Sequence, residues 1–166
     1  IAARRVDSCR GLVTIASNPC FRARPQWPEG MAPDIFDAFQ EAFRLDPEET
    51  LKRFRLLCSR GGYDPRTLAR QLEVSRYDSA PAVLDAGLQL LAELDGRGAL
   101  HGYFGPQLHL FAGGDALVPP TACDALRRWM PGIEAELIAS TSHALPLERP
   151  DDVAATIAAF IRGRAK

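Results

Sequence analysis

Hydrophobic residues recur along the chain in two different patterns. A run of consecutive apolar, mostly β-branched residues over 12–16 ends at the turn signal Ser17-Asn18-Pro19, which is typical of a strand buried on both faces in a parallel sheet. From about residue 33 to 94 the apolar residues instead recur every three to four positions, as in amphipathic helices. No strand pattern interrupts this stretch, so we predict an inserted all-helical unit.

Four helices are predicted in this stretch. The second and third begin at Asp46-Pro47 and Asp64-Pro65, where the aspartate can cap the helix and the proline occupies its first turn. The fourth spans about 80–94. The first carries an apolar stripe at helical spacing, made of Ile35, Phe36, Phe39 and Phe43.

Strands and helices alternate again in the last third of the chain. The pattern predicts strands over 107–112 and 136–139, and helices over 121–130 and 150–161. With strand 12–16, this order indicates the α/β fold class, a parallel sheet with flanking helices.

The predicted elements divide the chain into two units. Residues 1–20 and 95–166 are expected to form the α/β core, and residues 21–94 a helical cap or lid inserted into it. The chain begins at Ile1 rather than at Met and enters an apolar strand soon afterwards. We therefore expect it to be a piece of a longer protein.

Composition and charge exclude several classes of protein. Hydrophobic residues make up 46% of the 166 residues, which excludes bulk disorder. Twenty basic and 21 acidic side chains leave a net charge of −1, so no overall field would recruit nucleic acid or an anionic membrane. Charged residues interrupt every apolar stretch well before the roughly 18 residues of a membrane span. The four scattered cysteines favour reduced thiols in a cytoplasmic protein.

Two loops carry the residues best suited to catalysis. Asp115 follows the strand predicted over 107–112, and His143 follows the strand predicted over 136–139. Ligands of open α/β sheets bind at the carboxyl ends of strands, where neighbouring loops lie side by side. A carboxylate that accepts the imidazole N–H fixes the tautomer and stabilises the imidazolium. Each residue alone could be an ordinary loop residue, but the pair favours a catalytic acid–base couple.

The nucleophile that such a pair would activate is not found in the sequence. Hydrolases of the α/β type place it in a G-x-S-x-G turn. No serine of the chain has that frame, and no cysteine or aspartate fills an equivalent one. We therefore expect the nucleophile to lie outside these 166 residues.

A basic cluster lies in the predicted cap. Residues 51–76 contain seven basic and two acidic side chains. Arg66 and Arg70 stand four residues apart, on one face of a helix. Such a cluster can simply be a solvated helix surface, but beside an active site it favours docking of an acidic partner or substrate.

Several segments resemble the pimeloyl-acyl-carrier-protein methyl ester esterases of biotin synthesis, BioH-like α/β-hydrolases. They are Leu12–Phe21 with Trp27-Pro28, Arg53-Phe54 with Leu56-Leu57, Gly87-Leu88 with Leu90-Leu91, Gly114–Pro119, and Ser142-His143-Ala144 with Pro146 and Pro150. The similarity covers nearly all of this chain but only the C-terminal part of such an enzyme. It implies a partial α/β-hydrolase fold with a helical cap.

The resemblance also implies roles for individual residues. These are the triad acid and base for Asp115 and His143, a substrate-channel position for Phe54, and contacts with the acidic carrier protein for Arg53, Arg66 and Arg70. The implied activity is serine-type hydrolysis of a carrier-bound carboxylic ester, with no metal or organic cofactor. The missing N-terminal half of the same fold would supply the nucleophile, so the chain alone is expected to be inactive. Two alternatives are a general esterase and an inactive fragment that retains the docking surface.

Overall fold

A three-stranded parallel sheet forms the centre of the core. Its strands are β1 (Leu12–Ile15), β2 (Gln107–Ala112) and β3 (Glu134–Ile138), in the order β1-β2-β3. The structure is a computed structural model and describes residues 2–4, 8–74 and 79–163. Every residue of the central strand β2 is buried, as its nearly continuous apolar sequence predicts.

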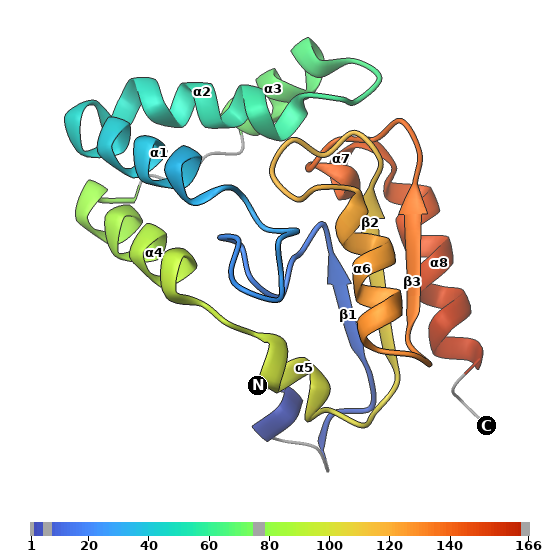
Figure 1. The fold of residues 1–166 in the computed structure, drawn as a ribbon. Coiled ribbons are helices and arrows are strands. Elements are labelled where there is room, and N and C mark those ends of the chain that lie inside the picture. The colour runs from blue at the N-terminus through green and yellow to red at the C-terminus, as the bar shows by residue number, and fades with distance from the viewer. Residues whose placement is uncertain (1, 5–7, 75–78, 164–166) are drawn as a thin grey trace.

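Two helices cover opposite faces of this sheet (Figure 1). Helix α6 (Thr121–Trp129) packs its buried residues against Phe111, whereas α8 (Pro150–Gly163) packs against Leu108 and Leu110. Successive side chains of a strand point to opposite faces, so the single strand β2 supplies both halves of the core. The predicted fold class, α/β with flanking helices, is confirmed.

Strand β1 is less buried than its sequence suggests. We expected burial on both faces, but all four of its residues are only half-buried. Strand β1 pairs with β2, from Leu12 opposite Gln107 to Ile15 opposite Leu110. No second strand borders it among the described residues. An apolar run therefore predicts the strand correctly, but it does not reveal which neighbours cover the strand.

A layer of four helices lies apart from the sheet (Figure 1). Its members are α1 (Pro33–Leu45), α2 (Pro47–Ser59), α3 (Pro65–Val74) and α4 (Pro81–Glu93). The predicted caps are present: the Asp46 carboxylate accepts a hydrogen bond from the Glu49 amide at 3.0 Å, and the Asp64 carboxylate accepts one from the Thr67 amide at 3.1 Å. The division into core and cap at these helices stays a prediction.

Several details differ from the sequence-based expectations. Strand β3 begins two residues earlier than predicted, at Glu134. Ile35 of the predicted apolar stripe is 59% exposed, while Phe36 and Phe43 are buried. The patterns did not predict three short elements, because each is too short to show a hydrophobic period: a 3-10 helix (Ala2–Arg4), α5 (Arg97–His101) and α7 (Leu145–Glu148).

A buried histidine links strands β1 and β2. The Thr14 hydroxyl donates to Nδ1 of His109 at 2.7 Å, and Nε2 of His109 donates to the Gln107 side-chain oxygen at 3.2 Å. The Gln107 amide nitrogen donates to the carbonyls of Leu100 and Tyr103, which turns its oxygen toward the imidazole. Burial lowers the pKa of His109 to about 4, so this ring is neutral at pH 7.

The neutral state of His109 makes stability depend on pH. In the unfolded chain its pKa is about 6.5. Below that pH the unfolded state therefore binds a proton that the folded state does not bind. We expect this residue alone to lower the free energy of unfolding by about 2 kcal/mol between pH 7.5 and pH 5. Urea unfolding at both pH values measures the loss, which should disappear in His109→Asn and persist in His101→Asn. Equal pH dependence of wild type and His109→Asn would contradict this assignment.

Candidate functional site

The structure brings the two predicted catalytic residues together. The Asp115 carboxylate oxygen Oδ2 lies 2.9 Å from Nδ1 of His143. Asp115 follows β2 and His143 follows β3, which pair in parallel, so both residues stand at the carboxyl edge of the sheet. The Asp115 side chain is 1% exposed and that of His143 is 27% exposed. The carboxylate is thus shielded from water while the imidazole remains accessible.

Backbone amides hold the Asp115 carboxylate in one orientation. Its other oxygen, Oδ1, accepts hydrogen bonds from the amides of Leu117 at 2.8 Å and Val118 at 2.9 Å. These bonds satisfy one carboxylate oxygen and leave the second to face His143.

The two loops are also bonded to each other through their backbones. The Gly113 amide donates to the Ile138 carbonyl at 2.8 Å, and the Gly114 amide donates to the Thr141 carbonyl at 2.7 Å. Ser140 lies between these acceptors with φ of 55°, a left-handed conformation that few non-glycine residues adopt. This turn brings the chain back beside the Asp115 loop and places His143 opposite the carboxylate.

The helical layer rests directly on this pair of loops. A Cβ on Gly61, just after α2, would lie 2.0 Å from the Gly114 carbonyl oxygen, and a Cβ on Gly114 would lie 2.5 Å from the Gly61 carbonyl oxygen. Gly61 also has φ of +86°, which favours glycine. In addition, the Ala144 amide donates to the Cys58 carbonyl at 3.2 Å. The end of α2 is therefore fixed against both the Asp115 loop and the His143 loop.

Cys58 lies beside this arrangement, since its carbonyl accepts from Ala144, and its electrostatics oppose a nucleophilic role. Burial, with a smaller contribution from the Asp115 charge, raises the pKa of the Cys58 thiol to about 12. The thiolate is the reactive form of cysteine, so at neutral pH this group stays protonated. Any nucleophile that His143 activates must therefore be a different group.

A cavity of about 620 Å³ opens at the carboxyl ends of all three strands, within the range of small-molecule sites. The loop after each strand contributes to its wall: Ser17 after β1, Leu117 and Val118 after β2, and His143 after β3. Apolar side chains of the helical layer supply most of the remaining lining, among them Ile35, Phe39, Phe43, Leu51, Phe54, Leu88 and Leu91. The cavity suits a largely apolar ligand whose reacting group lies near His143.

The remaining predicted site residues fall in two places. Phe54 lines the cavity, with its ring centroid 5.9 Å from that of Phe39. Arg53, Arg66 and Arg70 lie on the exposed surface of α2 and α3, outside the cavity lining. The strand-end residues of the lining were not predicted as site residues, although their position directly after an apolar run was visible in the sequence.

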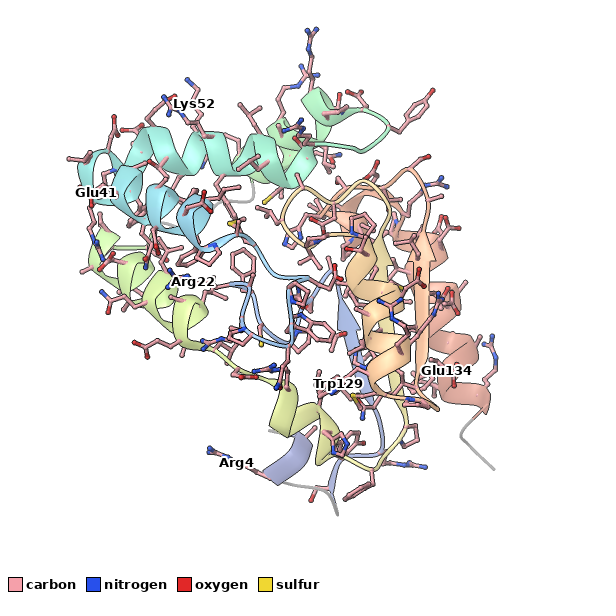
Figure 2. The ribbon with its side chains drawn as sticks, in the orientation of Figure 1. Arg4, Arg22, Glu41, Lys52, Trp129 and Glu134 are labelled. Carbon is pink, nitrogen blue, oxygen red and sulfur yellow. The ribbon has the colours of Figure 1, made fainter. Side chains whose placement is uncertain are left out.

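Charge on the outer surface of the helical layer is partly neutralised. Arg53 pairs with Glu49 at 3.1 Å, and Lys52 lies 3.7 Å from the same carboxylate. Figure 2 shows Lys52 on the side of α2 that faces away from α1 and α4. Arg55 forms an ion pair with Glu73, which joins α2 to α3. The basic surface is therefore less positive than the residue count alone suggests.

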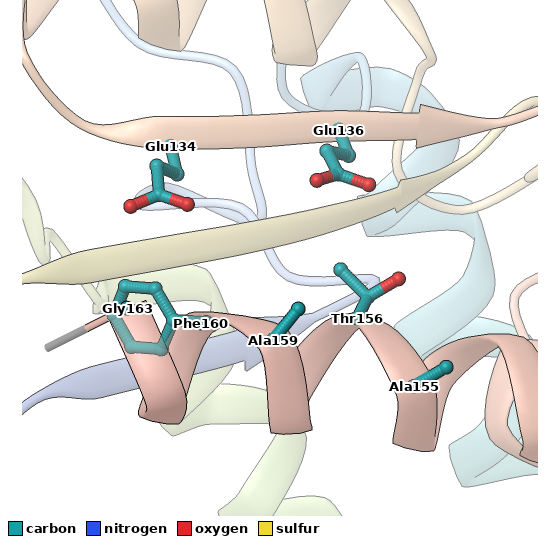
Figure 3. A pocket seen from close by; sticks show the side chains of 7 residues that line it. All are labelled: Glu134, Glu136, Ala155, Thr156, Ala159, Phe160 and Gly163. Carbon is teal, nitrogen blue, oxygen red and sulfur yellow. The ribbon is translucent and has the colours of Figure 1, made fainter. Parts of the chain in front are cut away.

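A second hollow, of about 500 Å³, lies between β3 and α8. Figure 3 shows Glu134 and Glu136 of β3 across from Thr156 and Phe160 of α8. His143 and Asp115 do not line it. In the described part of the chain, no group of three or more potential ligands could hold a metal ion, and no helix has the length and hydropathy to cross a membrane.

Comparison with known proteins places this geometry in a family. No protein-family model matches the chain. A pimeloyl-acyl-carrier-protein methyl ester esterase of Aromatoleum aromaticum is 34% identical over 171 residues, covering 98% of this chain and 68% of the relative. The chain belongs to this esterase family. An esterase of the same name from Serratia marcescens is 35% identical over 154 residues, covering 91% of this chain and 60% of the relative.

Solved structures show the same fold. The esterase EaEST from Exiguobacterium antarcticum superposes with a TM-score of 0.82 at 18% sequence identity, covering 97% of this chain and 62% of that one. The family membership and the partial α/β-hydrolase fold expected from the sequence are confirmed. The chain spans about 60% of the Serratia relative's length.

Proposed function

We propose that the protein is a serine-type carboxylic ester hydrolase in which His143 is the general base and Asp115 its orienting acid. A serine hydroxyl from outside these 166 residues attacks the ester carbonyl and gives its proton to Nε2 of His143. The imidazolium returns the proton to the leaving alcohol, and water then releases the acid from the acyl-enzyme by the same route. This scheme requires no metal or organic cofactor.

The observation that carries the proposal is the 2.9 Å contact between Asp115 and Nδ1 of His143 at the wall of an apolar cavity. With Nδ1 bonded to a carboxylate, the neutral ring presents Nε2 as a proton acceptor. The same contact stabilises the positive charge that the ring acquires when it takes the proton. The high pKa of Cys58 further favours an oxygen nucleophile.

The substrate that fits best is an ester with a long apolar acyl chain. Residues 21–94 would act as a cap over the cavity, with Phe54 in contact with the chain. The relatives are named pimeloyl-acyl-carrier-protein methyl ester esterases, and we propose the same carrier-bound methyl ester as substrate. A cytoplasmic location accords with this role and stays a prediction.

The exposed arginines of the helical layer would receive the acidic carrier protein. Arg66 and Arg70 lie on α3, which follows the turn that contacts the catalytic loops. A carrier bound there could direct its attached acyl group toward the cavity. Arg53, paired with Glu49 on α2, would contribute at the edge of the same surface.

A serine-directed fluorophosphonate probe tests the reaction type. We expect no labelling of the 166-residue chain, because none of its serines has the nucleophile frame. Extending the chain by the coding sequence that precedes Ile1 should produce labelling, and Asp115→Asn or His143→Gln should then slow it by about 100-fold or more, the usual scale of general base catalysis. Labelling of the 166-residue chain itself would contradict the assignment.

Charge reversal tests carrier docking separately from chemistry. In the extended protein, Arg66→Glu with Arg70→Glu should lower kcat/KM for the carrier-bound ester by about tenfold, because like charges would then oppose association. Hydrolysis of a short free ester should be unchanged. Arg128→Glu, an equivalent change at an exposed position of α6, serves as the control. Equal effects on the bound and free esters would contradict docking at this surface.

A further inference from the structure

Glu148, the last residue of the short helix α7, joins the catalytic loop to the helical layer. Its Oε2 accepts hydrogen bonds from both the amide and the hydroxyl of Ser142, at 2.8 and 2.9 Å. Its Oε1 accepts a hydrogen bond from the amide of Tyr63 at 2.7 Å. Tyr63 lies in the turn between α2 and α3, so one carboxylate binds both layers of the molecule at once.

The Ser142 end of this contact is fully buried. Ser142 is 0% exposed, so its amide and hydroxyl cannot turn to bulk water when Glu148 is removed. Buried donors without acceptors are costly, and bonds to a carboxylate are stronger than bonds between neutral groups. The loop conformation around Ser142 therefore depends on this carboxylate.

The turn of the helical layer is shaped to admit the carboxylate. A Cβ on Gly62 would lie 2.5 Å from Glu148 Oε1, so a side chain at this position would displace the carboxylate. The glycine thus leaves room for the bond between Glu148 and the next residue, Tyr63.

His143 lies between two such anchors. Ser142, immediately before it, is held by Glu148, and Ala144, immediately after it, donates to the Cys58 carbonyl of α2. Glu148 is itself bonded to the α2–α3 turn, and Cys58 belongs to α2. Both neighbours of His143 are therefore held in place relative to the helical layer. A small displacement of that layer would move the imidazole relative to Asp115.

From this geometry we propose that Glu148 is a positioning residue for His143. It acts through Ser142, so the position of the imidazole depends on the position of the α2–α3 turn. The inference rests on the proposed function of His143 as general base. Glu148 does not line the cavity, so its effect is on alignment of the ring and not on the reactant. Loss of the carboxylate would loosen the bond between His143 and Asp115 without removing either partner.

The exchange of the His143 Nδ1 proton with water tests this role in the chain as it stands. NMR spectroscopy measures the exchange rate, with the resonance assigned by its loss in His143→Gln. In Glu148→Ala the rate should rise by about tenfold or more, the scale of one lost charge-assisted hydrogen bond. In Glu148→Gln the rise should be smaller, because the amide oxygen can still accept from one side. Glu136→Gln, the same chemical change at an exposed position of β3, should leave the rate unchanged.

The buried His109 provides an internal reference. Its Nε2 proton is bonded to Gln107 inside the sheet, so a general loss of stability would accelerate exchange at His109 as well. Acceleration at His143 alone supports positioning, whereas acceleration at both residues, or none at His143, overturns it. If Glu148→Ala does not fold, Ser142→Ala removes only the hydroxyl contact and should give a smaller acceleration, again confined to His143. This readout does not require ester hydrolysis, so its failure is distinguishable from failure of the proposed function.

Discussion

The hydrogen bond between the buried Asp115 carboxylate and His143 is the contact on which the candidate site depends. Each partner is set by local backbone geometry: two amides hold the carboxylate, and a left-handed residue at Ser140 turns the His143 loop back toward it. The parallel pairing of β2 and β3 brings the two loops to one edge of the sheet. The pair is thus preorganised by the fold, which reduces the reorganisation that a catalytic step would otherwise require.

The helical layer contacts the candidate site directly. Gly61 and Gly114 pack at a distance that no side chain could tolerate, and the helices supply most of the apolar cavity wall. The same layer therefore shapes the ligand space and supports the loops beneath it. In the proposed enzyme, carrier docking on α3 would occur on the element next to the turn that Glu148 binds. The position of the bound carrier and the alignment of His143 would then both depend on the α2–α3 turn.

Much of this arrangement could be predicted from local patterns. The apolar run before Gly113, and the loop position of His143, were enough to place both catalytic candidates at strand ends, because parallel strands present their carboxyl ends together. The contact between Glu148 and Tyr63 could not be predicted, since it joins residues 85 positions apart through the placement of the helical layer. Helix α7 has only four residues, too few for a hydrophobic period. The half-buried state of β1 likewise depends on neighbours that the run itself does not encode.

The tautomer of His143 tests the central contact most directly. Nitrogen-15 chemical shifts of the neutral imidazole report which ring nitrogen carries the proton. We expect the proton on Nδ1 in the wild-type chain. In Asp115→Asn it should shift to Nε2, because the amide group can donate to Nδ1 where the carboxylate could only accept. An unchanged tautomer in Asp115→Asn would show that Asp115 does not orient the imidazole, and it would contradict the account.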